Sequence, residues 1–270
     1  MSYEFYYPQG KKKALTFSYD DGQVFDRRLV EIFNKYDMKA TFHLNSGTLG
    51  TDGFVTKKEV KSLYKGHEVS CHSVTHPYLT KLSKEQLVEE IREDRRQLET
   101  ETGYPVRGMS YPFGEYDADV EKALSVLGIE YSRTVNSTSG FHTPGNFLEW
   151  HPTCHHNGEK ENKLSDLLES FQNPPPWVKL PLFYIWGHSY EFYRENNWEV
   201  IEDFCKAAAH NPDVWYATNI EIKEYICALK SLILSVDQTM VYNPGAVSVW
   251  LARAGESAVE LRAGQSLTFK

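Results

Sequence analysis

The order of apolar and polar positions predicts strands that alternate with amphipathic helices over most of the chain. Short apolar runs, such as Ala14 to Tyr19 and Ala40 to Leu44, are typical of buried strands, whereas the segments between them repeat apolar residues near the period of an α-helix. The clearest helix should begin after Ser83, because Ser83 and Gln86 fit a capping box, and it should end at Gly103.

The same pattern continues along the chain and determines the expected fold class. Further strands are expected at residues 68–71, 109–111, 129–135, 148–154, 180–186 and 214–217, and helices at 24–33, 57–64, 117–127, before 172, before 210 and at 221–229. Repeated strand–helix units indicate parallel strands covered by helices, either in a barrel or in an open doubly wound sheet, and we favour the barrel. We therefore predict an α/β fold over residues 1–230, built as a distorted or incomplete (β/α) barrel.

Residues 231–270 have a different pattern. Short apolar runs at 232–236, 240–242, 247–251, 259–261 and 266–269 are separated by turn residues, among them Asn243-Pro244-Gly245. The segment is too short for a core of its own. We therefore predict a small C-terminal β extension packed on the barrel, and this extension is the candidate subunit contact if the protein is a homo-oligomer.

Composition and charge narrow the function classes. Lys and Arg total 29 against 37 for Asp and Glu, so the formal net charge of −8 offers no global attraction to nucleic acid. No segment reaches the ~20 apolar residues that span a bilayer, and the N-terminal segment lacks the layout of a secretory signal. The four cysteines have no short paired spacing, which fits reduced thiols. We expect a cytoplasmic protein that binds neither nucleic acid nor membrane.

Candidate chemistry gathers where three predicted strands end, which is the end of an α/β barrel at which active sites form. Asp20 and Asp21 leave the first strand side by side, so one carboxylate can bind a metal ion while the other faces substrate; an Asp-Gly turn is the alternative. His72 and His76 are four residues apart, and they share a face if this segment forms a helical turn.

Two histidines and one aspartate, with open positions for water and substrate, make the layout of a catalytic zinc-type site. We therefore expect a divalent metal ion, zinc in the first place, with cobalt, nickel or manganese as alternatives. His188 ends an apolar strand, where it can act as a general acid or base near neutral pH. Packing in the core is the alternative role for this histidine.

Several motifs resemble those of the polysaccharide deacetylase family, also called carbohydrate esterase family four. The segments TFSYDDG, HSVTH, SYPFG and WGH resemble the family's first, second, third and fifth motifs. The resemblance covers residues 12 to 220, and the family fold, a distorted β/α barrel, agrees with the alternation of strands and helices.

The resemblance implies a metal-dependent deacetylase that removes acetyl groups from N-acetylated oligosaccharides or polysaccharides. In this reaction the metal ion polarises the acetyl carbonyl and lowers the pKa of a bound water. The resemblance also implies a role for each matched residue: general base Asp20, metal ligands Asp21, His72 and His76, general acid His188, and an oxyanion-binding backbone amide at Phe113.

The chain departs from the family pattern at three motifs. The third has Ser110 where the family usually has an Arg that pairs with the base, and we hypothesise that Arg133 supplies this guanidinium; a surface Arg is the alternative. The fifth has Trp186 where the family has the Leu that lines the acetyl-methyl pocket. The fourth, normally Asp followed by Trp, has only Glu149-Trp150 as a loose counterpart, and Glu149 could orient the acid.

Two further groups of residues near the expected barrel rim could bind sugar or metal. Aromatic side chains there could stack on sugar faces, with apolar packing as the alternative: Trp150, Trp177, Trp186 and Tyr190. The substrate-binding candidates are Phe113, Trp186 and Trp150. A cluster of potential ligands matches no tetrahedral metal spacing, and we interpret it as a rim loop: His151, Cys154, His155 and His156.

Three other functions stay open at this stage. One is a hydrolase of a non-sugar amide or imide, because Ser110 and Trp186 depart from the family pattern. Another is an O-acetyl-xylan esterase that uses the same machinery. The third is a non-catalytic carbohydrate-binding relative that kept the metal site.

Overall fold

The structure, a computed structural model, describes residues 3–158 and 163–269. Its largest element is a sheet made of β2 (Lys13–Asp21), β3 (Ala40–Leu44), β4 (Glu68–Cys71), β5 (Gly108–Ser110), β6 (Tyr131–Arg133), β7 (Cys154–His155), β8 (Leu182–His188) and β9 (Val214–Tyr216). The strand order is β6-β5-β4-β3-β2-β8-β7, with β9 also paired to β2, and every pairing is parallel. Within the described residues no strand pairing joins β6 to β7, so the sheet is an open, distorted β/α barrel, as predicted.

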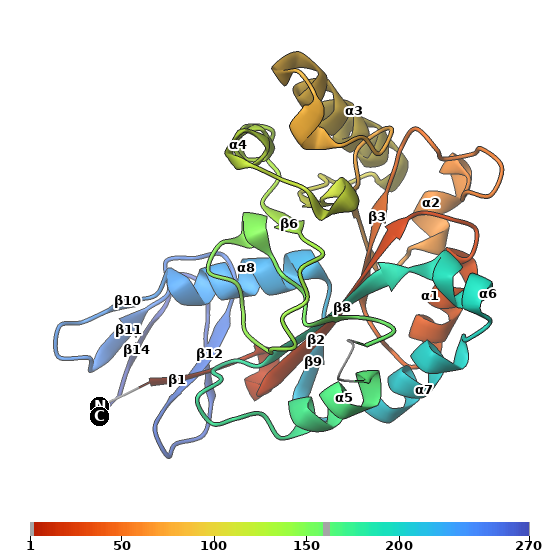
Figure 1. Cartoon of the computed structure of the whole chain (residues 1–270). Helices are drawn as coiled ribbons and strands as arrows, with labels where there is room; N and C mark the ends of the chain where they lie inside the picture. The colour runs from red at the N-terminus through yellow and green to blue at the C-terminus, as the bar shows by residue number, and fades with distance from the viewer. Residues whose placement is uncertain (1–2, 159–162, 270) are drawn as a thin grey trace.

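The helices lie around the outside of this sheet (Figure 1). They are α1 (Asp26–Lys35), α2 (Lys57–Leu63), α3 (Lys84–Thr102), α4 (Ala118–Val126), α5 (Leu164–Gln172), α6 (Ser189–Glu195), α7 (Glu199–Ala208) and α8 (Asn219–Lys230). Helix α3 has the predicted ends, since Ser83 and Gln86 form a capping box and Gly103 ends the helix with φ 81°. Among the described residues no helix has the length and apolar character that crossing a membrane requires.

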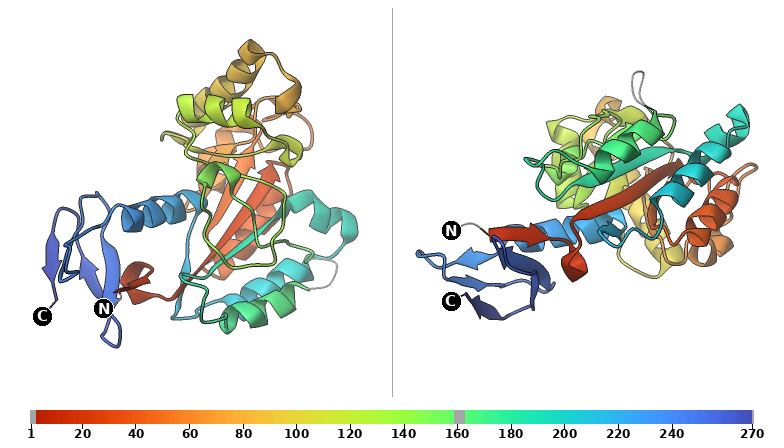
Figure 2. Two further views of the ribbon diagram at one scale, coloured as in Figure 1. Left: turned by 60° about the vertical axis from the view of Figure 1, so that its left-hand side comes forward. Right: turned by 90° about the horizontal axis from the view of Figure 1, so that it is seen from below.

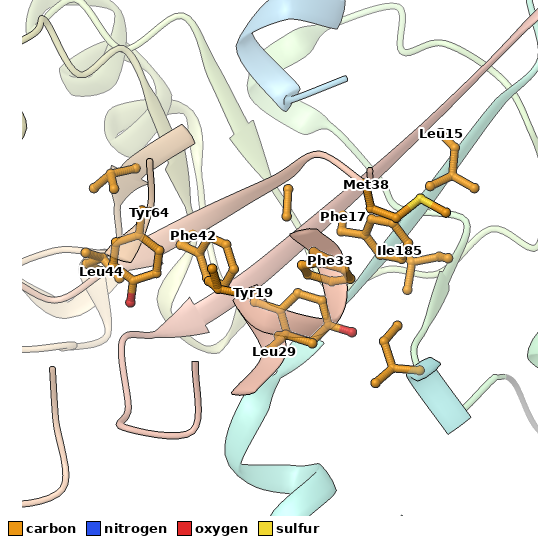
Figure 3. Close-up of a cluster of buried hydrophobic side chains, with 14 of the residues drawn as sticks. Leu15, Phe17, Tyr19, Leu29, Phe33, Met38, Phe42, Leu44, Tyr64 and Ile185 are labelled. Atoms are coloured by element: carbon orange, nitrogen blue, oxygen red, sulfur yellow. The ribbon is translucent and has the colours of Figure 1, made fainter. Parts of the chain in front are cut away.

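Strand β2 is buried on both faces, and its two faces differ in chemistry. Leu15, Phe17 and Tyr19 point toward the helices, where Phe17 packs on Phe33 of α1 with ring centroids 4.6 Å apart (Figure 3). The alternate residues Thr16, Ser18 and Asp20 are polar and buried, and they face the barrel interior. This alternation explains why a carboxylate at the end of β2 points inward, toward the axis of the barrel.

The C-terminal extension forms two small antiparallel sheets beside α8 (Figures 1 and 2). One contains β10 (Ile233–Leu234), β11 (Met240–Tyr242) and β14 (Ser266–Thr268), and the other contains β1 (Tyr3–Tyr6), β12 (Val249–Arg253) and β13 (Val259–Leu261). The N-terminal strand β1, which the sequence pattern did not predict, therefore pairs with a C-terminal strand. The Tyr225 hydroxyl of α8 donates to the Tyr6 carbonyl at 2.5 Å and so links this sheet to the barrel. The domain boundary at residues 230 and 231 stays a prediction.

Two other sequence predictions differ from the structure. Residues 148–154 do not form one strand, because Pro152 lacks a backbone N–H; a 3₁₀ turn (Phe147–Glu149) and the two-residue strand β7 occupy this segment. Helix α6 was not predicted, since it follows β8 without any intervening turn residue. Three more 3₁₀ turns lie at Pro8–Gly10, Leu79–Lys81 and Pro112–Gly114.

Candidate active site

The carboxyl ends of β2, β4, β5, β6 and β8 bring the predicted polar residues to one edge of the barrel. Asp20 lies beside His188 in the register of the β2–β8 pair. The Asp20 side chain is 3% exposed, and it is contacted by Ser110 of β5, Arg133 of β6 and His72, which follows β4. A carboxylate buried this deeply requires charged and hydrogen-bonding partners.

Arg133 and Ser110 supply those partners. The Arg133 guanidinium, itself fully buried, pairs with Asp20 Oδ2, and the Ser110 hydroxyl donates to Asp20 Oδ1 at 3.0 Å. Burial acts to raise the pKa of Asp20, but the opposing charge of Arg133, with a smaller effect of His72, holds this pKa well below its usual range. Asp20 is therefore ionised at neutral pH.

Strand register explains how Arg133 reaches this place. Ser110 on β5 and Arg133 on β6 are paired residues, so the guanidinium comes from the position directly beside the serine. The Arg133 guanidinium carbon also lies 4.5 Å from the centroid of the Trp186 ring. The unusual residues at positions 110, 133 and 186 therefore form one contact group around Asp20.

Asp21, His72 and His76 form the first candidate metal site. Their ligand atoms all lie within 4.8 Å of one another, and His72 Nε2 is 3.7 Å from Asp21 Oδ1. His72 Nδ1 lies 2.9 Å from the Ser110 carbonyl, which can only accept, so the proton is on Nδ1 and the Nε2 lone pair faces Asp21. Buried Nε2 has no hydrogen-bond partner among the described residues, which is the environment expected of a metal ligand.

The backbone around these residues is unusual. Residues 72–76 do not form the helical turn assumed from the i, i+4 spacing; Ser73 and His76 adopt left-handed φ angles of 65° and 55°, and this tight turn brings the two imidazoles together. Their ring centroids are 4.7 Å apart. Asp21 and Phe113, with φ angles of 79° and 58°, share this conformation, and such strained residues concentrate at functional sites.

Asp94 supports the site from α3, although no motif in the sequence includes it. Its Oδ2 accepts from the His72 backbone N–H at 3.0 Å, and its Oδ1 accepts from the Ser46 N–H at 2.8 Å. Burial raises the pKa of Asp94 to about 7. Asp94 is one of many charged residues along α3. The only sequence signal for its inward direction is its helical spacing from the apolar residues Leu87, Ile91 and Leu98.

The carboxylate beside His188 is Glu191, and the expectation for Glu149 is wrong. Glu191 Oε2 accepts from the His188 backbone N–H at 3.0 Å and lies 3.2 Å from His188 Nδ1. The same oxygen lies 3.0 Å from His155 Nε2. Burial acts to lower the pKa of His188, but the hydrogen bond to Glu191 and the nearby Asp20 leave this pKa raised. Glu149 lies in the 3₁₀ turn after β6, where Glu121 is its charged neighbour.

The candidate aromatic residues divide into four groups. Phe113 is half exposed and stacks on Tyr78 with centroids 4.0 Å apart, and Tyr190 lies 5.1 Å from the His188 ring. Trp186 is partly buried between Arg133 and the histidines. Trp150, in contrast, is 1% exposed and packs in the core, so its predicted substrate contact is wrong. Trp177 is exposed, but it precedes β8 and so lies at the opposite end of the barrel.

The comparisons with known proteins agree with the family resemblance of the motifs. Residues 8–132, just under half of the chain, match the polysaccharide deacetylase family model. The match includes Asp20, Asp21, His72 and His76, whereas His188 lies outside it.

Two curated relatives match part of the chain. A peptidoglycan-N-acetylglucosamine deacetylase of Listeria monocytogenes is 28% identical over 123 residues, which are 45% of this chain and 26% of the relative. Chitin deacetylase 1 of Cryptococcus neoformans is 27% identical over 143 residues, which are 52% of this chain and 30% of the relative. The chain therefore matches less than a third of the length of either relative.

Solved structures show the same fold over more of the chain. A Mycobacterium smegmatis protein provisionally described as a polysaccharide deacetylase has a TM-score of 0.63 at 16% identity, with 83% of this chain and 93% of that chain covered. A Bacillus anthracis pseudoenzyme of carbohydrate esterase family four has a TM-score of 0.52 at 19% identity, with 82% and 68% covered. The same fold therefore occurs in a protein described as a deacetylase and in a pseudoenzyme. The fold by itself does not indicate activity, so activity has to be argued from the site of this chain.

Proposed function

We propose that this protein is a metal-dependent deacetylase of N-acetylated sugars. The observation that carries the proposal is the juxtaposition of a buried, ionised Asp20 with the ligand set Asp21, His72 and His76 and with His188 on the neighbouring strand β8. The matches to deacetylases of peptidoglycan and of chitin support an N-acetylated sugar as the substrate class.

Asp21, His72 and His76 would hold a divalent metal ion, with zinc as the first candidate for this ligand set. When bound, the ion supplies a Lewis acid that favours attack of water on the acetyl carbonyl. The donor set fits this role, because the hydrogen bond from His72 Nδ1 to the Ser110 carbonyl fixes the tautomer that leaves Nε2 able to bind the ion.

The remaining steps follow from the residues around the ligand set. Asp20 takes the proton of the attacking water, while Arg133 and Ser110 hold its carboxylate in place. The backbone N–H of Phe113 stabilises the developing oxyanion, a contribution on the order of 3 kcal/mol for one such donor. His188, which Glu191 orients and whose pKa is raised, then protonates the departing sugar amine.

Acetate release by purified, metal-loaded protein tests the proposal. The substrates are N-acetyl-chitooligosaccharides, a peptidoglycan fragment and acetylated xylan, with a chelator and Asp20→Asn as controls. Release that requires both the metal ion and Asp20 is the expected result. Release from xylan alone would make the protein an O-acetyl esterase, and no release from any substrate by metal-loaded protein would refute the proposal.

A further inference from the structure

A second group of metal-ligating side chains lies beside the proposed active site. One ligand atom each from His155, His188 and Glu191 lies within 4.8 Å of the others. The three residues come from the end of β7, the end of β8 and the first turn of α6. Two imidazoles and one carboxylate form the protein ligand set that open zinc sites use.

Imidazole nitrogens of three histidines lie close to one carboxylate oxygen, Oε2 of Glu191. Glu191 Oε2 lies 3.0 Å from His155 Nε2, 3.2 Å from His188 Nδ1 and 3.6 Å from Nε2 of His156. The second Glu191 oxygen has Arg194 as its charged neighbour, at 3.8 Å. Three imidazoles that face one carboxylate oxygen resemble ligands arranged around a shared centre.

His156 provides an independent observation. This side chain is fully buried, and neither of its ring nitrogens has a hydrogen-bond partner among the described residues. Its ring is held between Tyr19 and Phe192, and Gly187 fits against it so closely that a Cβ at position 187 would lie 2.0 Å from His156 Nδ1. Packing therefore fixes Nε2 of His156 in its direction toward Glu191, 3.6 Å from Oε2, beside the three ligands.

We propose that His155, His188 and Glu191 bind a second divalent metal ion, with His156 beside them, and that this ion inhibits the enzyme. The inhibitory part rests on the proposed function, because it assumes that His188 delivers a proton to the leaving amine. A metal ion on His188 Nδ1 displaces the proton there, so the ring can no longer be an imidazolium. Donation from Nε2 would then have to leave an imidazolate, which is far less favourable.

The binding part is tested by zinc titration of chelator-stripped protein, with calorimetry and metal analysis as readouts. We expect two equivalents in the wild type, and a second equivalent that binds at least about tenfold more weakly in both His155→Gln and Glu191→Gln. Asp21→Asn should lose the first equivalent and keep the second. His151→Gln is the matched control from the same segment, since its Nδ1 pairs with Thr134, and it should keep both equivalents.

The inhibitory part is tested by acetate release as free zinc rises beyond the first equivalent. We expect the rate to fall in the wild type and in His151→Gln, and to fall less in His155→Gln. A wild type that binds one equivalent only, or a second equivalent whose affinity is unchanged in either site variant, would show that Glu191 is a hydrogen-bonding residue alone. If no substrate is deacetylated while the second equivalent still depends on His155 and Glu191, the metal site stands and the proposed function fails.

Discussion

At the scale of single residues, the position of Arg133 is the main departure from the motif pattern. Its guanidinium reaches Asp20 from β6, one strand away from the position where the family usually carries an Arg. The ion pair with the Asp20 carboxylate requires a guanidinium beside it. Because Ser110 and Arg133 are paired across β5 and β6, an arginine at either position can place its guanidinium there. The hypothesis that Arg133 orients Asp20 agrees with this geometry, and its effect on activity stays a prediction.

Replacing Arg133 by Lys should reduce acetate release on the order of 100-fold, because an ammonium cannot hold Asp20 as the planar guanidinium does. Arg133→Ala is less informative, since an uncompensated buried charge costs about 3–5 kcal/mol of folding free energy. Initial rates, with thermal unfolding and metal content as checks on the fold, measure the effect. Arg27→Lys is the control, since the pair of Arg27 with Glu59 lies near the surface.

The exchange variant Ser110→Arg with Arg133→Ser tests whether the guanidinium can orient Asp20 from β5 as well as from β6. It returns the guanidinium to β5 and should recover part of the activity that Arg133→Lys loses. Equal rates for wild type and Arg133→Lys would instead show that Arg133 balances charge without orienting the base.

Glu191 should act as a positioning residue for His188. Glu191→Gln should lower kcat on the order of 10- to 100-fold and change KM little, because proton transfer depends on the direction of the imidazole whereas sugar binding does not. Steady-state kinetics measures both constants. Glu195→Gln, at the exposed end of the same helix, is the matched control, and a change in KM alone would contradict this role for Glu191.

At the scale of elements, long periodic segments were predictable and short connections were not. The ends of α3 followed from Ser83 and Gly103, whereas the 72–76 segment forms a turn because Ser73 and His76 adopt left-handed backbone angles. Such angles depend on the surrounding contacts, among them the hydrogen bond from the His76 N–H to the Ser73 hydroxyl. Helix spacing therefore predicted that His72 and His76 lie together, as they do, but it is the turn and not a helix that brings them together.

Glu68 shows how the elements are tied together inside the barrel. Its carboxylate on β4 accepts from Thr41 Oγ1 of β3 at 2.9 Å, from Tyr131 of β6 at 2.7 Å and from the Ile220 N–H of α8 at 2.9 Å. Burial raises the pKa of Glu68 to about 7. The folded protein therefore holds a proton on Glu68 over a pH range in which the unfolded chain has released it.

The contribution of Glu68 to the stability of the metal-free protein should consequently fall as pH rises from about 4 to about 7. The sign follows because the raised pKa of Glu68 favours the folded state below the unfolded value, and this advantage is lost as pH approaches the folded value. Glu68→Gln should remove about 3–4 kcal/mol of this change in the free energy of unfolding between the two pH values. Denaturant unfolding at several pH values measures it, with exposed Glu256→Gln as the control; an unchanged slope in Glu68→Gln would count against the assignment.

At the scale of the whole molecule, the N- and C-terminal strands form one sheet on the barrel. Leu251 on β12 is fully buried in a core cluster that also contains Tyr7 and Tyr225. This core joins the extension to both ends of the barrel chain. We therefore expect the extension to unfold together with the barrel.

Leu251→Ala should lower the free energy of unfolding by about 2–5 kcal/mol, because it opens a cavity in the shared core. Val236→Ala in the same extension should change it by less than about 0.5 kcal/mol, since Val236 is fully exposed. Calorimetry should show a single transition in each case. A separate early transition in Leu251→Ala would mean that the extension folds as its own unit.

The sequence by itself determined the features that depend on local chemistry and on period. These are the parallel strands with outer helices, the β-rich character of the C-terminal extension, and the candidate set Asp20, Asp21, His72, His76 and His188, because motif residues follow strand ends that must meet at one edge of a barrel. The tertiary structure alone decided which neighbours these residues have. Arg133, Asp94 and Glu191 reach the site by strand register, helix packing and the start of α6, and Trp150 is buried by contacts between segments distant in sequence. Such contacts depend on how whole elements pack, which no local pattern along the chain contains.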